Sequence, residues 1–367
     1  MDVPRQNPGA EDRTSRPESR AHAALADLTS ALGIENGDVE LTGDDPIFPS
    51  PYRIGCAGAA SLAASALAAA RFWENRGGEA QRIGVDARHA AASLRSGKYF
   101  EINGVAGPSP FDDWTDYYPV RDGRYVYLQN NAAPHRQAFL SVIGAVDNKV
   151  QAFEKTRGWD GGELEDAVHA AGGVAGLVRT AAEWAAHPQG KLIASEPLVR
   201  IERIGDAPAP APSRRAARPL EGLRVLDLTR VIAGPICSRT LASHGADVLR
   251  ISAAHVADIG LAELETGIGK RSTRLDLRHP DDRTAFEGLL AGTDVVVDGY
   301  RPGAMAAHGL TPAAFLIVAS ALRKTCPAQR QDGERTYPQI DFCRYLTIIQ
   351  VVECAIIRGY GSDCRHL

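Results

Sequence analysis

The stretch LEGLRVLDLTRVIAGPICSRTLASHGADVLRIS, residues 220–252, decides the fold of this chain. Residues 223–228 form a short apolar run, a connection with glycine and proline follows, and residues 236–244 have the apolar spacing of a helix. Gly245 ends that helix, and residues 246–251 are a second apolar run, typical of a buried strand. The pattern predicts two parallel strands joined by a helix, and ligands commonly bind at the turn after the first strand.

The residues that follow extend the same pattern. Residues 270–277 are strand-like, residues 281–290 have helical spacing, and residues 293–298 are a third buried strand that ends at the glycine-bearing turn 299–305. We therefore expect an α/β fold in which a Rossmann-like parallel sheet is covered by helices. The glycine pattern G-x-G-x-x-G follows none of these strands, which argues against a nicotinamide dehydrogenase.

The N-terminal side predicts a smaller α+β module. Residues 57–75 form an alanine-rich helical stretch, and residues 81–86 and 122–131 are strand-like. Residues 174–186 are expected to be helical, and residues 197–204 are expected to be a strand.

Composition limits the classes of function. The chain has 367 residues, 44% of them hydrophobic, with a net charge of -4 and a pI near 6.2, so nothing attracts nucleic acid or an anionic membrane surface. No apolar run reaches the roughly 20 residues of a membrane span, and the N-terminus lacks a secretory signal. We expect a cytoplasmic protein. None of the six cysteines forms a C-x-x-C pair, so we expect no metal site.

Three blocks occur in a specific order, at 220–235 with 245–251, at 269–277 and at 294–312. They resemble the family III CoA-transferases, which include formyl-CoA and carnitine-type CoA-transferases and the 2-methylacyl-CoA racemases. Residues 45–205 resemble, more weakly, the later part of such a module. A later part thus precedes an early part, which indicates a tandem arrangement whose second module is truncated.

This resemblance divides the chain into five predicted segments. In chain order they are a disordered tail with a short helix (1–42), a degenerate family III module (43–205), an Ala/Pro linker (206–219), the CoA-binding half of a second module (220–315) and a divergent or frame-shifted tail (316–367).

The resemblance also implies which residues bind coenzyme A or an acyl-CoA. The implied residues are Val231, Ile232 and Ala233 against the adenosine part, Arg250 at the phosphates, Leu275, Asp276, Leu277 and Arg278 along the site, and Gly299, Tyr300 and Arg301 in the last turn. CoA needs cations for its phosphates and an apolar slot for adenine, and Arg271 is a further candidate cation. The alternative is that these arginines are ordinary solvated surface charges. Ser252 and Gly299 replace polar residues that are usual in the family.

In the family, an aspartate attacks the acyl-CoA thioester, forms an anhydride and then an aspartyl-CoA thioester, and passes CoA to a carboxylic acid. The expected Gly-aromatic-Asp context is absent. Asp341 and Asp363 are the late aspartates nearest the right region, and neither has that context, so the catalytic residue stays unknown.

Three hypotheses follow. The chain is a family III CoA-transferase that acts on an acyl-CoA and a carboxylic acid, or a racemase-like isomerase of 2-methylacyl-CoA. Alternatively, it is a catalytically inactive truncated relative that at most binds CoA or a partner subunit. The resemblance further implies an interlocked homodimer.

Overall fold

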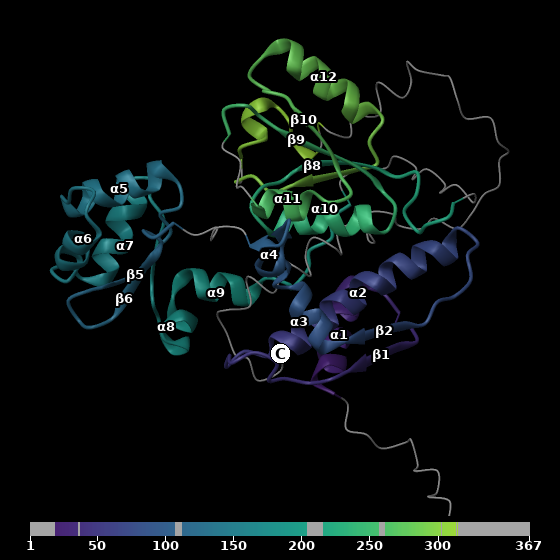
Figure 1. Ribbon diagram of the computed structural model, residues 1–367, viewed down its shortest axis with the longest axis horizontal. Coiled ribbons are helices and arrows are strands. Elements are labelled where there is room, and N and C mark those ends of the chain that lie inside the picture. The colour runs from purple at the N-terminus through teal and green to yellow at the C-terminus, as the bar shows by residue number, and fades with distance from the viewer. Residues whose placement is uncertain are drawn as a thin grey trace, which may run out of the picture. The chain divides into compact units, whose positions relative to one another are not determined.

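A computed structural model describes the chain in two compact units (Figure 1). It describes residues 19–314, except for 36, 107–111, 204–215, 257–260, 302 and 313. The described residues of the first unit lie within 1–96, 197–257 and 266–367, and those of the second lie within 97–196 and 258–265. The first unit therefore combines stretches from both sides of the Ala/Pro-rich linker.

Four parallel strands form the main sheet of the first unit. They are β8 Arg224–Leu228, β9 Asp247–Ser252, β10 Arg271–Arg274 and β11 Val295–Asp298, in the order β10-β9-β8-β11. Val225 of β8 is in register with Val248 of β9 and with Val295 of β11. The chain thus moves from β8 to one side and later returns to the other. Open parallel sheets bind ligands where the strand order reverses in this way.

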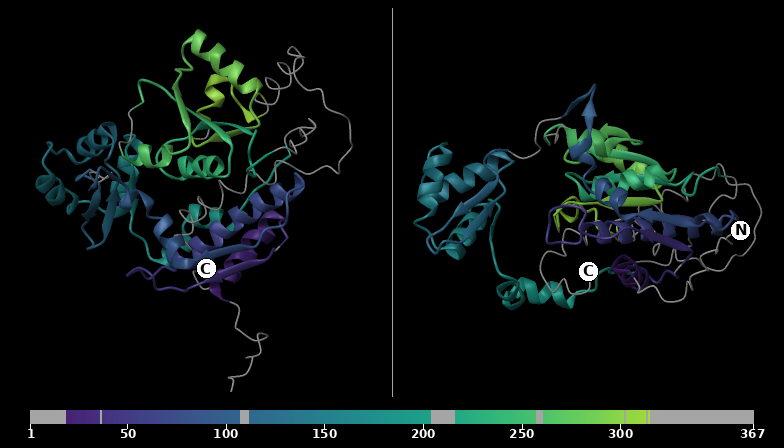
Figure 2. Two further views of the ribbon diagram at one scale, coloured as in Figure 1. Left: turned by 45° about the vertical axis from the view of Figure 1, so that its right-hand side comes forward. Right: turned by 60° about the horizontal axis from the view of Figure 1, so that its bottom comes forward.

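Both faces of this sheet are covered, which explains why its strands are apolar runs rather than alternating patterns. On one face the core contains Val225, Val248 and Val297 with Cys237 and Leu241 of α10 Ala233–Ser243. On the other face it contains Leu226, Leu228 and Ile251 with Phe286 and Leu290 of α12 Pro280–Ala291. The two helices lie on opposite sides of the green strands in Figures 1 and 2. The predicted buried strands at 223–228, 246–251 and 293–298 are confirmed.

The N-terminal part of the first unit is a helical layer beside a two-stranded parallel sheet. Its elements are α1 Arg20–Leu32, β1 Val39–Thr42, α2 Ile54–Asn75, β2 Ile83–Asp86 and α3 Ala87–Ser93. Alanines on α2 are completely buried, which lets α1 and α3 approach its backbone closely. Helix α2 is long and apolar enough to cross a membrane, but 72% of that window is buried inside the protein, as in the core helix of a globular unit.

Helix α2 also joins this layer to the main sheet. Phe72 belongs to the same buried cluster as Leu220, Leu223 and Val225. Arg76, only 4% exposed, donates hydrogen bonds to the carbonyl oxygens of Pro219 at 2.7 Å and Glu221 at 2.8 Å. The stretches before and after the linker therefore share one core.

The second unit is an antiparallel sheet with three helices. The strands are β5 Asp116–Pro119, β6 Tyr125–Leu128 and β7 Ala175–Leu177, and the helices are α5 Ala133–Ile143, α6 Lys149–Thr156 and α7 Gly161–Ala170. Tyr118 is fully buried, stacked on Phe153 and edge-on to Phe139. The remaining short elements of the chain are α4 Ser96–Tyr99, β3 Glu101–Ile102, β4 Val105–Ala106, α8 Ala181–Ala186, α9 Pro188–Ser195, α11 Leu261–Gly267 and the 3-10 helix Ala306–His308.

Two predicted elements are wrong. The expected helix at 174–186 is strand β7 followed by α8, because residues 175–177 pair with β6 and Thr180 starts a new helix with a capping box. The expected strand at 197–204 is not a strand within the described residues 197–203. Val199 there is 6% exposed and packs into the α1–α2 core, so its apolar character reflects packing rather than sheet pairing.

Candidate functional site

Three side chains from different strands come together at the carboxyl end of the main sheet. Arg230 follows β8, Arg250 lies near the end of β9, and Tyr300 follows β11. Burial raises the pKa of the Tyr300 phenol, and the positive charges of Arg230 and Arg250 partly oppose that rise. Two positive charges therefore act on one phenol at this end of the sheet, a setting suited to an anionic ligand with an apolar part.

Two glycines allow the turns after β8 and β11 to pack tightly. A Cβ at Gly234 would lie 2.3 Å from Cβ of Thr229, which no side chain can tolerate. A Cβ at Gly299 would lie 3.3 Å from Cγ2 of Thr229. Thr229 is therefore enclosed by the first turn of α10 on one side and by the β11 turn on the other.

The turn itself exposes apolar side chains. Val231 is 56% exposed and Ile232 is 45% exposed, and both lie just before α10, which begins at Ala233. Val231 has φ 76°, in the left-handed region that β-branched residues avoid. Such a conformation costs about 1–3 kcal/mol and persists only where the surroundings hold it. The turn thus presents two apolar side chains in a strained backbone.

Beneath the turn, Asp227 is completely buried and accepts four hydrogen bonds. Its Oδ1 accepts from the Thr229 amide at 2.9 Å and from the Thr229 hydroxyl at 2.5 Å. Its Oδ2 accepts from the Ser238 hydroxyl at 2.5 Å and from Lys270 Nζ at 2.9 Å. A buried carboxylate is tolerated only with such complete pairing.

Lys270 completes this network, and its side chain is 2% exposed. Its ammonium also donates to the carbonyl oxygen of Pro235 at 2.8 Å and to Oγ of Ser238 at 2.7 Å. Burial lowers the pKa of Lys270, while the charge of Asp227 opposes that change. Neither residue was among the predicted site residues. The signals that could have found them are an aspartate inside an apolar strand and a lysine at the start of the strand-like run 270–277.

The predicted segment at 275–278 makes contacts within the protein. Leu275 and Leu277 pack against the core that contains Phe286. Asp276 and Arg278 form a bidentate pair, with Nε–Oδ1 at 2.8 Å and Nη2–Oδ2 at 2.6 Å. The hydrogen bond from Arg278 lowers the pKa of Asp276 well below its usual range. The guanidinium of Arg278 would have to leave Asp276 to hold a phosphate, so the CoA-binding role of these four residues stays a prediction.

The predicted cations Arg271 and Arg301 differ in position and in hydrogen-bond partners. Arg271 pairs with Asp247, the first residue of β9, so it lies toward the amino end of the strands, away from the turns. Arg301 is exposed, and no hydrogen bond or ion pair engages its guanidinium among the residues that the structure describes. Arg250 and Arg301 are thus better placed than Arg271 to meet a ligand.

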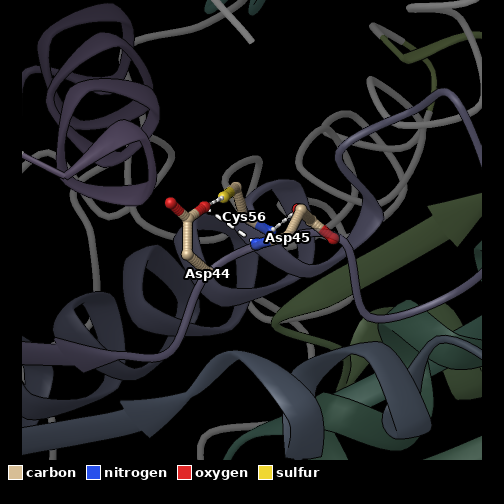
Figure 3. A group of neighbouring side chains, drawn as sticks. All are labelled: Asp44, Asp45 and Cys56. Carbon is tan, nitrogen blue, oxygen red and sulfur yellow. Dashed lines mark hydrogen bonds between the residues drawn. The ribbon is translucent and has the colours of Figure 1, made fainter.

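A second cluster, Asp44, Asp45 and Cys56, lies at the start of α2 (Figure 3). Asp45 accepts hydrogen bonds from the amides of Gly55 at 3.0 Å and Cys56 at 2.8 Å, and Cys56 Sγ donates to Asp44 at 3.1 Å. Burial, followed by the bond to Asp44, raises the pKa of the Cys56 thiol to about 12. The thiol is therefore neutral near pH 7, and Asp45 caps the start of α2.

Asp341 and Asp363, the aspartates nearest the expected position of a nucleophile, lie outside the described residues.

Residues 220–319 match CoA-transferase family III. An acyl-CoA transferase of Gibberella moniliformis is 27% identical over 77% of this chain and 56% of its own length. Acetyl-coenzyme A transferase nodX of Hypoxylon pulicicidum is 32% identical over 53% of this chain and 36% of its own length. A solved CAIB/BAIF family protein from Brucella suis is 28% identical over 28% of this chain and 31% of that chain, with a TM-score of 0.25. The chain thus spans about half or less of these relatives' length.

Proposed function

We propose, from the match of residues 220–319 to CoA-transferase family III, that the turns after β8, β9 and β11 bind the CoA part of an acyl-CoA. The observation that carries the proposal is the exposed apolar turn at Val231 and Ile232, together with the influence of the Arg230 and Arg250 charges on the pKa of Tyr300. In this proposal the arginines hold phosphates and the apolar turn contacts adenine. The strand order around β8 supports a Rossmann-like sheet, whose ligands bind at this edge.

For the whole protein we propose CoA transfer from an acyl-CoA to a carboxylic acid. A carboxylate attacks the thioester carbonyl and releases the CoA thiolate, and the resulting anhydride is then opened by that thiolate at the enzyme's own carbonyl. The acyl group leaves as its free acid, and the acceptor acid takes over CoA by the reverse sequence. Relatives whose names state such reactions, for example the succinyl-CoA:mesaconate CoA-transferase of Haloarcula hispanica at 41% identity over 102 residues, support this class.

The described carboxylates Asp227, Asp276 and Asp298 at this edge each have hydrogen-bond partners, and Asp298, which ends β11, accepts from the Tyr300 amide at 2.9 Å. Asp227 is buried under Lys270, and Asp276 is held by Arg278. We therefore propose that the nucleophile comes from another part of the protein or from a second subunit of a homodimer. The same observation favours the second candidate function, an inactive relative that binds CoA or a partner. No contact in the described structure favours the racemase-like alternative.

The tandem arrangement stays a proposal, and one finding supports it. The alignment with the Gibberella relative includes 77% of this chain, far more than residues 220–319 contain. That relative therefore also matches sequence outside the family III region, in the same order along the chain. A cytoplasmic location is proposed from the sequence alone.

Calorimetry of the full chain with coenzyme A tests the binding proposal. We expect measurable binding, and we expect Arg250→Met to weaken it about tenfold or more, because a hydrogen bond to a charged group contributes about 1.5–3 kcal/mol. Arg224→Met is the matched control, since Arg224 is exposed at the amino end of β8. No heat of binding at millimolar CoA would refute the proposal. Incubation with an acyl-CoA and a carboxylic acid, followed by chromatography, separates an active transferase from an inactive relative.

A further inference from the structure

Lys270 belongs to no predicted site, yet it connects three elements of the first unit. Its ammonium has three hydrogens, and it has three acceptors, on Asp227 of β8 and on Pro235 and Ser238 of α10. The residue itself lies directly before β10. Every donor of the buried cation is therefore used, and each bond joins the start of β10 to one side or the other of the turn between β8 and α10.

We propose that Lys270 is a positioning residue, whose buried ammonium holds the turn 229–235 in the conformation that presents Val231 and Ile232 to the ligand. The inference rests on the proposed function for the identity of that ligand, the adenosine end of CoA. It names a determinant of CoA binding that does not itself touch CoA.

The geometry favours positioning over a contribution to bulk stability. Burying an ion pair costs the hydration of both ions, and apolar residues of similar size often stabilise a core as well or better. What a buried pair supplies is a fixed geometry. Here that geometry is needed, because Val231 adopts φ 76° although its neighbours leave it 56% exposed. Its own side-chain packing therefore contributes little to holding it there.

The route from Lys270 to the turn is short and direct. Asp227 Oδ2 receives Lys270 and Ser238, while Asp227 Oδ1 receives the amide and hydroxyl of Thr229. Thr229 is the first residue of the turn and is enclosed by Gly234 and Gly299. Loss of the ammonium removes one donor from the buried Asp227 carboxylate and one from the Pro235 carbonyl, so both ends of the turn lose a hydrogen bond.

The test compares four forms of the full chain with the unchanged protein: Lys270→Met, Ser238→Ala, the double variant Asp227→Asn with Lys270→Met, and the control Arg271→Met. Methionine keeps the length of the lysine stem without its charge. Arg271→Met removes the neighbouring cation, which pairs with Asp247 on the surface. Ser238→Ala removes one contact of the ammonium without leaving an unpaired charge, so the test survives if Lys270→Met fails to fold.

Hydrogen exchange followed by mass spectrometry measures the protection of the backbone amides in the turn in the absence of any ligand. We expect Lys270→Met to speed exchange of peptides covering 229–236 about tenfold while peptides from β9 keep their rates. Ser238→Ala should act in the same direction and less strongly, and Arg271→Met should have no effect. Unchanged protection of 229–236 in both Lys270→Met and Ser238→Ala overturns the inference.

Calorimetry then separates positioning from structural support. Adenosine 3′,5′-bisphosphate, the adenosine end of CoA, should bind Lys270→Met about tenfold more weakly, with pantetheine unaffected. The double variant has a neutral pair, so its melting temperature should recover while its affinity for the bisphosphate stays low. If the double variant recovers both its melting temperature and its affinity for the bisphosphate, the inference is overturned, because Lys270 would then only neutralise the charge of Asp227. If the unchanged protein binds neither CoA nor the bisphosphate, the proposed function fails, and hydrogen exchange alone decides the role of Lys270.

Discussion

Lys270 Nζ lies 2.9 Å from Oδ2 of Asp227, and the two side chains are only 2% and 0% exposed. The residues are 43 positions apart in the sequence, on β8 and directly before β10. Such a pair is costly to break, because removal of one partner leaves the other charge buried without compensation. The relationship explains why the turn between them can keep a strained residue exposed to solvent.

Asp227→Ala should destabilise the first unit by about 3–5 kcal/mol, because it leaves the Lys270 ammonium buried and unpaired. Urea unfolding followed by circular dichroism measures the change. Asp294→Ala is the control, since Asp294 accepts a hydrogen bond from the Arg224 amide at the amino end of β8, where burial is lower. Equal losses in the two variants would contradict the special role of the buried pair.

Arg76→Met should cost about 2–4 kcal/mol, because two carbonyl oxygens, of Pro219 and Glu221, lose a charged donor in a buried setting. The control is Arg71→Met on the same helix, where the side chain is 30% exposed and pairs with Glu74, and its cost should stay below about 1 kcal/mol. The unfolding midpoint of the full chain is the measurement. An unchanged midpoint in Arg76→Met would mean that the N-terminal helices and the main sheet do not share a core.

Glu165→Gln should remove part of the acid sensitivity of the second unit. Burial alone would raise the pKa of Glu165, but hydrogen bonds from Arg179 and from the Leu177 amide lower it on balance below 4.5. A carboxylate with a lowered folded pKa contributes stability above its unfolded pKa and loses it as pH falls through the folded value. The melting temperature should therefore decrease less steeply in the variant than in the unchanged protein as the pH falls below 4.5.

The control for that experiment is Glu163→Gln, which changes an exposed residue of the same helix. It should leave the pH profile of the melting temperature as it is in the unchanged protein. A profile that flattens equally in both variants would show that total charge, rather than the Glu165–Arg179 pair, causes the acid sensitivity.

Cys56 should resist alkylation in the folded protein. Its thiol is buried and has its pKa raised to about 12, so the reactive thiolate is scarce at pH 8. Iodoacetamide labelling followed by peptide mass spectrometry should find this cysteine unmodified in native buffer and modified in urea. Rapid native labelling of Cys56 would contradict the hydrogen-bonded cap at the start of α2.

Much of the main sheet could be predicted from local sequence. The apolar runs ending at Leu228, Ile251 and Asp298 are strands because both of their faces are buried, which removes the alternation of an exposed strand. Gly234 and Gly299 marked the turns correctly, since each permits a close approach to Thr229. The errors at 174–186 and 197–204 arose where apolar residues pack without the element that their spacing suggests.

The binding role of the candidate site residues stays a prediction. The segments 231–233, 250 and 299–301 were identified through a family resemblance, and the charge of Arg250 lowers the pKa of Tyr300 against the effect of burial. Arg271 and Arg278 looked equivalent to Arg250 in the sequence. In the structure Arg271 pairs with Asp247 and Arg278 pairs with Asp276, and such pairing has no local sequence signal.

The sequence by itself determined the order of strands and helices from 220 to 312 and the family that this region matches, because periodicity and ordered motifs are properties of neighbouring residues. Only the tertiary structure decided that Lys270 is paired with Asp227 and that Arg76 binds carbonyls 143 and 145 positions away. Contacts across such distances depend on how the chain returns on itself. The stabilising and positioning roles of these cations follow from burial, which arises only when the elements pack.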